Sequence, residues 1–311
     1  MKKISRAHLI LFSSLVATMA IQRLLILLGV VNNGALMLIG QCILLIVPLA
    51  FMALWKEDIP KAIRLKKTHP MSFVIAIGAA AVSFPVISFL NLLSMLFVKN
   101  ALTDAMASLQ QTGFLVMFLT IAILPPISEE ILCRGVLYNT YRRRSPMTGV
   151  FLSAVLFSLF HMNLNQIPYA LFVGIVFAFM LEGSDSILVT MVMHFAINGY
   201  STVVNFLSTR NGAVDAAGQM ELLEMYAEQP MVLRMTLGIM GFQAFICCAI
   251  LIGLIYGMFK INGRDLRQIF GKRAKILTIE PKRESFADPW LFGFIGLTVL
   301  VTVLNYMAAR V

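Results

Sequence analysis

Long apolar stretches constrain the fold of this chain more than any other feature of its sequence. A helix that crosses the hydrocarbon core of a bilayer needs about 20 mostly apolar residues. Nine segments of the 311-residue chain come close to this requirement, at approximately residues 8–31, 34–54, 71–98, 113–141, 147–163, 167–181, 186–207, 231–259 and 290–309. Since a helix satisfies its own backbone hydrogen bonds in lipid, the sequence predicts an all-α bundle of about nine transmembrane helices.

Composition excludes the main alternatives to a membrane protein. Hydrophobic residues make up 59% of the chain and charged residues 13%, whereas soluble proteins average about 45–50% and about 25%. A secreted disulfide scaffold, a disordered regulator and an ordinary cytosolic enzyme are therefore excluded. The four cysteines lie in apolar stretches without metal-ligand spacing, and we interpret them as reduced packing residues. No internal repeat or linker divides the chain, so residues 1–311 are expected to form a single integral membrane domain.

The positions of the basic residues predict the orientation of the bundle. If the N-terminus is inside, the cytoplasmic segments hold 19 of the 25 basic residues and the outside segments hold three. Basic residues concentrate in cytoplasmic loops of membrane proteins, so this asymmetry predicts an inside N-terminus, an outside C-terminus and a multi-pass protein of the cell membrane. Residues 260–288 would form a basic cytoplasmic loop, and residues 208–230 an acidic outside loop. Topology thus explains the net charge of +10, and a nucleic-acid partner is not expected.

Three short segments place ionisable or polar side chains at membrane depth. An ionisable residue there is costly unless it is paired or hydrated, so it marks a candidate functional site. The segments are PPISEEILCRG at 125–135, FSLFH at 157–161 and HFAIN at 194–198. They lie in the fourth, fifth and seventh predicted helices, and each supplies at least one group that can take part in acid–base chemistry.

The first segment contains two neighbouring glutamates with different surroundings. Glu130 and Arg134 are four residues apart, so they share one helix face and can form an ion pair. Glu129 is rotated by about 100° from Glu130, which leaves it as a free carboxylate. The preceding prolines, at 125–126, predict a broken helix in which Ser128 caps a new helical start. Such a break would line a cavity that admits water.

The polar side chains of the three segments are expected to lie at a similar depth in the membrane. The fourth and fifth helices are expected to form a hairpin that turns near Ser145, with Glu129 and His161 each 16 residues from that turn. Both side chains then lie roughly 24 Å from the turn, and His194 and Asn198 can join them from one face of the seventh helix. A carboxylate beside an imidazole can deprotonate water. A second histidine and an asparagine can donate hydrogen bonds to an oxyanion. The combination predicts acyl hydrolysis.

Each polar residue also has a structural interpretation when it is taken alone. An ion pair such as Glu130–Arg134 can merely stabilise a helix, a histidine can be a hydrogen-bonded packing residue, and Phe157 can belong to the core. The same groups could form a relay in a transporter, but the inverted symmetry typical of such proteins is not visible in the sequence. Complementary groups at matched depth on three helices favour a reaction site.

These residues form three ordered motifs that resemble a known family. The motifs are EExxxR at Glu129, Glu130 and Arg134, FxxxH at Phe157 and His161, and HxxxN at His194 and Asn198. In this order they are similar to the motifs of the CPBP family, also called the Abi family, which contains CAAX proteases and bacteriocin-processing enzymes. The family includes the eukaryotic Ras-converting CAAX endopeptidase. The resemblance covers about residues 113–207, which correspond to the family's catalytic core of four helices.

The resemblance implies an intramembrane endopeptidase of the glutamic type. It implies that Glu129 and His161 activate the attacking water, and that His194 and Asn198 stabilise the tetrahedral oxyanion. The expected partners are a lipid bilayer and a peptide or membrane-associated protein substrate, while the oligomeric state stays open. The alternative is a non-proteolytic protein for bacteriocin immunity or membrane scaffolding, which would use the same cavity to bind a peptide.

Two further roles follow from the resemblance. Glu130 and Arg134 would orient and support the first glutamate, with Phe157 beside them. The side chains of Glu129, His161 and His194 could also hold a zinc ion with an open fourth position. Because Glu and His can activate water without a metal and no HExxH motif is present, the sequence favours a reaction without a cofactor.

Overall fold

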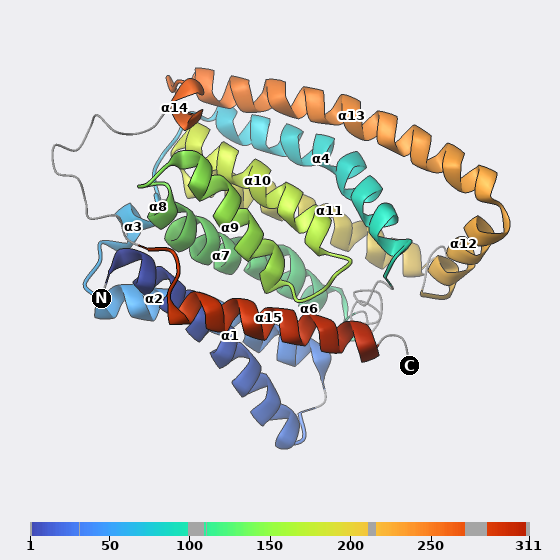
Figure 1. The fold of residues 1–311 in the computed structure, drawn as a ribbon, viewed down its shortest axis with the longest axis horizontal. Helices are drawn as coiled ribbons and strands as arrows, with labels where there is room; N and C mark the ends of the chain where they lie inside the picture. The colour runs from blue at the N-terminus through green and yellow to red at the C-terminus, as the bar shows by residue number, and fades with distance from the viewer. Residues whose placement is uncertain are drawn as a thin grey trace.

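The fold consists of helices throughout the part of the chain that the structure describes. A computed structural model describes residues 2–30, 32–98, 109, 111–210, 216–270 and 285–308 (Figure 1). The first half contains α1 (Lys3–Leu27), α2 (Asn33–Leu54), α3 (Ile59–Ala62), α4 (Met71–Met95), α6 (Phe114–Phe118), the π-helix η1 (Leu119–Ile123), α7 (Leu124–Glu130) and the π-helix η2 (Ile131–Tyr138). The second half contains α8 (Asn139–Tyr141), α9 (Pro146–Phe160), α10 (Ile167–Ser184), α11 (Ile187–Arg210), α12 (Ala216–Glu228), α13 (Pro230–Ile261), α14 (Arg267–Phe270) and α15 (Pro289–Ala308).

Long apolar helices confirm the predicted class, an all-α polytopic membrane bundle. Eight helical segments within the described ranges are long and apolar enough to cross a membrane, and they correspond to eight of the nine predicted spans. The remaining prediction, 147–163, corresponds to α9, which is apolar but only 15 residues long. The start of α1 and the end of α15 lie at opposite ends of the bundle (Figure 1). Which end faces the cytoplasm stays a prediction.

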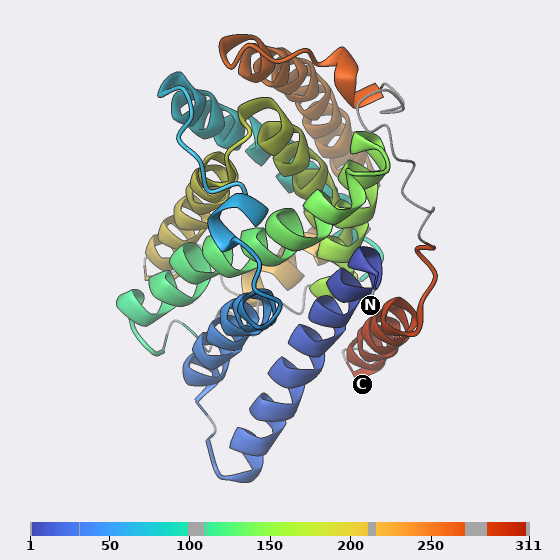
Figure 2. The same cartoon turned by 90° about the vertical axis from the view of Figure 1, so that its left-hand side faces the viewer.

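The fourth span lies at the centre of the bundle. It runs from α6 to α8, between a group formed by α1, α2 and α15 and a group formed by α4, α10, α11 and α13 (Figure 2). All eight residues of η2 are buried, whereas the outer helix α13 exposes large apolar side chains such as Phe242 and Phe245. Exposed apolar side chains on the outside and buried polar ones inside are expected of a bundle that faces lipid.

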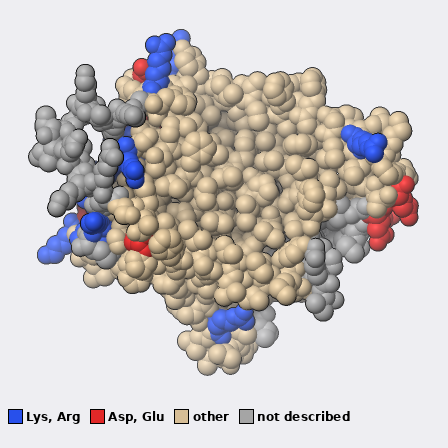
Figure 3. All heavy atoms as spheres, viewed as in Figure 1, with Lys and Arg blue, Asp and Glu red and all other residues tan. Residues whose placement is uncertain are grey.

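Charges gather at the two ends of the molecule. The face drawn in Figure 3 shows Lys and Arg mainly at the end where the chain begins, with a few at the opposite end and the lower edge, and the largest group of Asp and Glu at the opposite end. The acidic end includes the exposed side chains of Glu221, Glu224 and Glu228. Little charge lies between the two ends on this face, which is the distribution expected where hydrocarbon covers the middle of the molecule.

The predicted break at Pro125 and Pro126 is wrong. The segment Phe114–Tyr141 is one helix of 28 residues, and it contains two π-helical stretches, η1 and η2, on either side of α7. Ser128 does not cap a helix start, because its hydroxyl donates to the carbonyl of Leu124 at 3.0 Å and to Oε1 of Gln41 at 2.6 Å. A proline lacks an N–H and crowds the preceding turn, and a wider π-turn accommodates both effects without ending the helix.

Two predicted loops also differ from the structure. The segment 208–230 is not simply a loop, because α11 extends to Arg210 and the helix α12 occupies Ala216–Glu228, while Asp215 lies outside the described residues. Of the predicted basic loop at 260–288, the described part contains the end of α13 and the short helix α14, and residues 271–284 lie outside the described ranges.

Candidate active site

A buried ion pair forms the base of the candidate site. Nη1 of Arg134 lies 3.0 Å from Oε1 of Glu130, and both side chains are fully buried. Nη2 of Arg134 donates to the carbonyl of Gly174 on α10 at 3.2 Å. The pair follows from the spacing of four residues on one helix. It neutralises two charges that would be very costly to bury separately.

Two aromatic rings enclose the guanidinium of Arg134. Its central carbon lies 4.4 Å from the ring centroid of Phe157 on α9 and 5.0 Å from that of Phe177 on α10. The negative faces of the rings stabilise the cation. Phe157 is one of the predicted supporting residues, but sequence reasoning missed Phe177. In the sequence Phe177 is one apolar residue among many in its span, so no local signal distinguishes it.

His194 connects α11 to both glutamates. Its Nδ1 lies 3.1 Å from Oε1 of Glu130, and its Nε2 lies 3.9 Å from Oε2 of Glu129. An ionised carboxylate only accepts hydrogen bonds, so Nδ1 carries a hydrogen and donates it to Glu130. Sequence reasoning paired Glu130 with Arg134 alone and missed the bond from Glu130 to His194.

The free carboxylate of the site is Glu129. Its side chain is 14% exposed, whereas that of Glu130 is fully buried, as their rotation around the helix predicts. The 3.9 Å between Oε2 of Glu129 and Nε2 of His194 exceeds a hydrogen bond. A gap of this size can hold a small polar group that bonds to both side chains. Water is such a group.

His161 contacts the ring of Phe157. It follows the last residue of α9, and its Nδ1 donates to the carbonyl of Phe157 at 2.8 Å, because a carbonyl can only accept. The ring of Phe157 contacts His161 and His194 edge-on, at centroid distances of 4.9 and 6.3 Å. Within the described ranges His161 makes no direct hydrogen bond or ion pair with Glu129, so Phe157 connects it to the cluster. Nε2 of His161 is left with its lone pair.

Asn198 contacts the fourth span at a different point from His194. Its Nδ2 donates to the carbonyl of Ile121 in η1 at 2.9 Å. One of the two amide hydrogens is therefore committed to the backbone, and the second is available to another acceptor. Asn198 lies one turn after His194, so two successive polar residues of α11 contact two points of the same neighbouring helix.

The structure offers no preassembled metal centre in its described part. Among these residues no group of three or more His, Cys, Asp or Glu side chains is arranged to hold a metal ion. Oε2 of Glu129 and Nε2 of His194 lie 3.9 Å apart, but His161 is not grouped with them as a third ligand. The three ligands that zinc would require are thus not grouped, and no step of the chemistry below depends on a metal.

A second buried carboxylate, Glu182, was missed by sequence reasoning. It lies near the end of α10, one residue beyond the predicted span, and it accepts hydrogen bonds from four side chains. The donors are Tyr138 at 2.7 Å, Arg142 at 2.5 and 2.9 Å, Arg64 at 3.2 Å and Arg264 at 3.3 Å. The available signal was a glutamate directly after an apolar run, but its partners come from three separate parts of the chain.

Asp185 extends this second cluster towards solvent. Its carboxylate contacts Lys66 at 2.8 Å, Arg64 at 3.3 Å and Arg264 at 3.4 Å. Burial alone would raise the pKa of Asp185, but the hydrogen bond from Lys66 and the charges of the two arginines hold it below its ordinary value. We call Glu182, Asp185 and their basic partners the Glu182 cluster. Tyr138 belongs to η2, so one helical segment carries residues of both clusters.

Comparison with known proteins supports the family suggested by the motifs. The family model described as "Type II CAAX prenyl endopeptidase Rce1-like" matches residues 111–200, which include all three motifs. The chain is 25% identical over 108 residues to the Bacillus subtilis (strain 168) protein named "Putative membrane peptidase YdiL", which is 34% of this chain and 44% of that protein. The chain thus spans less than half the length of this relative. No solved structure matches it. The two matches support assignment to the CPBP family of CAAX proteases.

Proposed function

We propose that the chain is an intramembrane endopeptidase that hydrolyses a peptide bond of a membrane-associated substrate with a water activated by Glu129. The observation that carries this proposal is the partly exposed carboxylate of Glu129, which faces Nε2 of His194 across 3.9 Å. The family match over residues 111–200 supports a membrane protease, and the distribution of basic residues supports the cell membrane as its location.

In the proposed reaction Glu129 acts first as a base and then as an acid. Its carboxylate takes a proton from the bound water, and the hydroxide attacks the carbonyl carbon of the substrate. Glu129 then gives the same proton to the leaving amine as the C–N bond breaks, which leaves a carboxylic acid and an amine. Nε2 of His161 accepts the second hydrogen of the water and orients it, because Nδ1 is held by the carbonyl of Phe157.

The tetrahedral oxyanion requires donors from α11. Nε2 of His194 donates when the ring is protonated, and the hydrogen bond of Nδ1 to Glu130 stabilises that imidazolium. Glu130 and Arg134 hold His194 in place without contacting the substrate. Their burial prevents water from competing for the hydrogen bond to His194.

We propose that this reaction proceeds without a metal. Glu129 and His194 supply two side chains at a suitable separation, and within the described residues no third metal-binding side chain is grouped with them. Measurement of zinc in the purified protein, together with cleavage assays after chelation, tests this point. Stoichiometric zinc whose removal abolishes cleavage would contradict it.

The decisive experiment compares the wild type with the variant Glu129→Gln. The full chain, purified in detergent, is incubated with membrane-anchored peptides that carry either a prenylated CAAX end or no prenyl group, and mass spectrometry identifies the products. We expect Glu129→Gln to lower the cleavage rate by about 10²–10⁴-fold with unchanged membrane insertion. The matched control is Glu221→Gln, an exposed glutamate on α12, which should cleave like the wild type. Equal cleavage by Glu129→Gln and the wild type would contradict the proposal.

A further inference from the structure

The carbonyl of Ile121 cannot be satisfied by its own helix. In an α-helix a carbonyl accepts from the N–H four residues later, and in a π-helix from the N–H five residues later. For Ile121 these positions are Pro125 and Pro126, and neither has an N–H. The N–H three residues later, that of Leu124, is bonded to the carbonyl of Leu119. None of the usual helical donors is therefore available to Ile121.

Asn198 supplies the missing donor. Its Nδ2 lies 2.9 Å from the Ile121 carbonyl, at a depth where water is scarce. An unpaired backbone group in this environment is strongly unfavourable, so non-ideal helix backbone in a membrane needs a partner from a neighbouring helix. The bond replaces the hydrogen bond that the two prolines remove from the fourth span.

Two residues on one face of α11 form hydrogen bonds with the fourth span. His194 bonds to Glu130, and Asn198, one turn later, bonds to the carbonyl of Ile121. The two bonds lie on either side of Glu129 along the helix, and together they set the rotation and the depth of α7. They thereby fix where the carboxylate of Glu129 points.

We propose that Asn198 is a positioning residue, which holds Glu129 in place by donating to the backbone carbonyl that Pro125 and Pro126 leave without a partner. The part of this proposal that concerns cleavage rests on the proposed function, whereas the part that concerns folding does not. If it is right, an N–H restored within the fourth span makes the side chain of Asn198 dispensable.

The experiment is a rescue by a second substitution. Asn198→Ala should lower the melting temperature and reduce kcat by about 100-fold, since small displacements of a reacting group have effects of this size, with little change in KM. The double variant Asn198→Ala/Pro125→Ala regains a backbone donor for Ile121 and should recover both properties. Asn198→Asp, which cannot donate, should resemble Asn198→Ala.

The matched control is Asn198→Ala/Pro85→Ala, which removes a proline from the interior of α4 and should recover neither property. Recovery of the melting temperature without recovery of kcat would show that Asn198 acts on the substrate itself, and it would overturn the positioning role. If Asn198→Ala/Pro125→Ala does not recover the melting temperature, the hydrogen bond from Asn198 to the carbonyl of Ile121 does not have the proposed role. If the wild type cleaves none of the peptides, the proposed function fails, and the melting temperatures still decide whether Asn198 caps Ile121.

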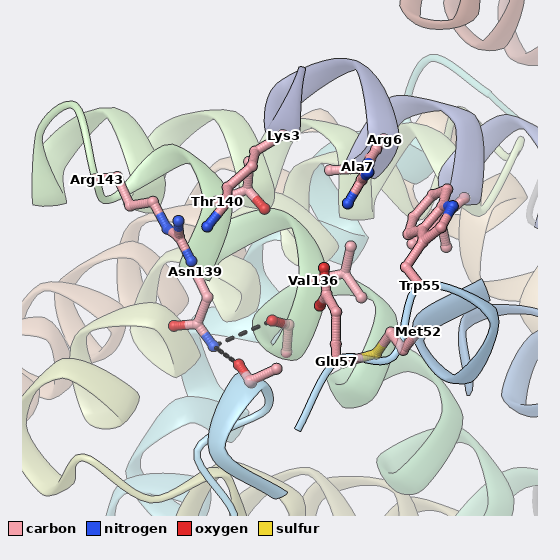
Figure 4. A pocket seen from close by; sticks show the side chains of 13 residues that line it. Lys3, Arg6, Ala7, Met52, Trp55, Glu57, Val136, Asn139, Thr140 and Arg143 are labelled. Carbon is pink, nitrogen blue, oxygen red and sulfur yellow. Dashed lines mark hydrogen bonds between the residues drawn. The ribbon is translucent and has the colours of Figure 1, made fainter. Parts of the chain in front are cut away.

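An independent observation concerns a pocket at the end of the bundle where α1 begins (Figure 4). The pocket has a volume of about 60 Å³ and lies between α1, the end of α2 and the region around α8. Three cations but only one carboxylate line it, namely Lys3, Arg6, Arg143 and Glu57. The hydroxyl of Thr140 and the amide of Asn139 also line it. The lining therefore carries a net positive charge.

Arg6 gives this pocket a donor that the protein itself does not use. Its guanidinium lies 4.8 Å from the ring centroid of Trp55, and its Nε is buried with no hydrogen-bond partner among the described residues. The first turn of α1 contains no acidic residue, and no side chain caps it. The positive end of the helix dipole therefore adds to the field in the pocket.

We infer that this pocket binds a phosphate group, carried by a lipid head group or by a free anion. A cavity needs about 10–15 Å³ of volume to hold one water molecule, so this pocket has room for a small anion such as a phosphate group. Basic pockets between transmembrane helices at the membrane surface are typical sites for anionic head groups.

The test measures the melting temperature of the purified full chain with inorganic phosphate, with phosphatidylglycerol vesicles and with phosphatidylcholine vesicles. Ligand binding to the folded state raises the melting temperature. A rise with phosphatidylglycerol alone identifies a lipid ligand, and a rise with phosphate identifies a free anion. In either case the rise should disappear in Arg6→Gln/Arg143→Gln and persist in Lys56→Gln/Lys67→Gln, whose two lysines are exposed and outside the pocket. No rise, or equal loss in both double variants, would overturn the inference.

Discussion

Glu130 and Glu182 are both buried carboxylates that face arginines, and they differ in how completely their oxygens are used. Four side chains donate to Glu182, and both of its oxygens accept. Glu130 accepts from Arg134 and His194 on Oε1 alone, and its Oε2 has no hydrogen-bond partner among the described residues. A hydrogen-bond network in which every group has a partner makes a fold rigid. A buried group without a partner calls for a separate explanation, such as a catalytic role.

The difference separates two tasks along one helix. The Glu182 cluster ties the ends of several helices together and presents no carboxylate to the proposed reaction. The Glu130 pair holds one imidazole, His194, and that imidazole faces the exposed carboxylate of Glu129. On this basis we assign stability to the first cluster and stability together with catalysis to the second. The predictions below test that division.

The largest expected effect on stability comes from Glu182→Gln. This change leaves Arg64, Arg142 and Arg264 close together without their shared counterion, and breaking a buried ion pair in this way costs about 3–5 kcal/mol. Chemical unfolding of the purified protein measures the loss. The cleavage rate per folded molecule should stay that of the wild type. A large loss of this rate with unchanged stability would reverse the assignment.

Glu130→Gln should lower stability by a smaller amount. Arg134 keeps its bond to the carbonyl of Gly174 and its two aromatic rings, so we expect about 2–3 kcal/mol from the lost charged hydrogen bonds. Unlike Glu182→Gln, this variant should also lose cleavage activity by about 100-fold, because His194 is no longer held. Melting curves and cleavage assays on the same preparation check both effects. An unchanged melting temperature would count against the ion pair.

Phe177→Leu tests how far the rings substitute for a second partner of Arg134. Loss of one of the two cation–π contacts should cost about 2 kcal/mol in a desolvated site, measured as a change in the free energy of unfolding. The matched control is Phe242→Leu on α13, whose side chain is exposed on the outer surface. That substitution should change stability by less than about 0.5 kcal/mol. Equal effects of the two variants would show that the ring over Arg134 has no special role.

The smallest effect is expected from Asp185→Asn, and it depends on pH. The pKa of Asp185 is lower in the folded protein than in the unfolded chain. Its contribution is therefore present above the unfolded pKa and is lost as the pH falls through the folded pKa. Because Asp185 and its partner Lys66 are partly exposed, we expect the substitution to lower the free energy of unfolding by less than about 1 kcal/mol. Asn tolerates the left-handed backbone at this position, where φ is 55°.

Melting temperatures between pH 7 and acidic pH check this prediction. The variant should be slightly less stable than the wild type at neutral pH, and the two should converge at low pH. A constant difference at every pH would show that the ordinary packing of Asp185, and not its charge, is responsible.

Local spacing predicted part of this structure correctly. Nearly all predicted spans were recovered, because a membrane helix is defined by its own run of apolar residues. The Glu130–Arg134 contact follows from a spacing of four residues on one helix. The different exposure of Glu129 and Glu130 follows from the rotation of about 100° per residue. In each case one segment contains all the information that the prediction needs.

Contacts between distant segments could not be predicted in the same way. Glu182 stands one residue after an apolar span, but its donors Arg64, Arg142 and Arg264 lie in three other parts of the sequence. Pro125 and Pro126 predict a break in the fourth helix, because the sequence shows that two N–H groups are missing. It does not show that the amide of Asn198 replaces one of them. Only the packing of α11 against the fourth span reveals the partner.

The π-helical segments determine the direction in which the side chains of the fourth span point. Each wide turn accommodates about one more residue than an α-helical turn would, and one residue corresponds to about 100° of rotation. The direction of every side chain after η1 therefore depends on that turn staying wide. If η1 became a regular α-helical turn without loss of a residue, every later side chain would rotate by about 100° and Glu129 would turn away from His194. The wide turn of η1 thus directs the carboxylate of Glu129 towards α11.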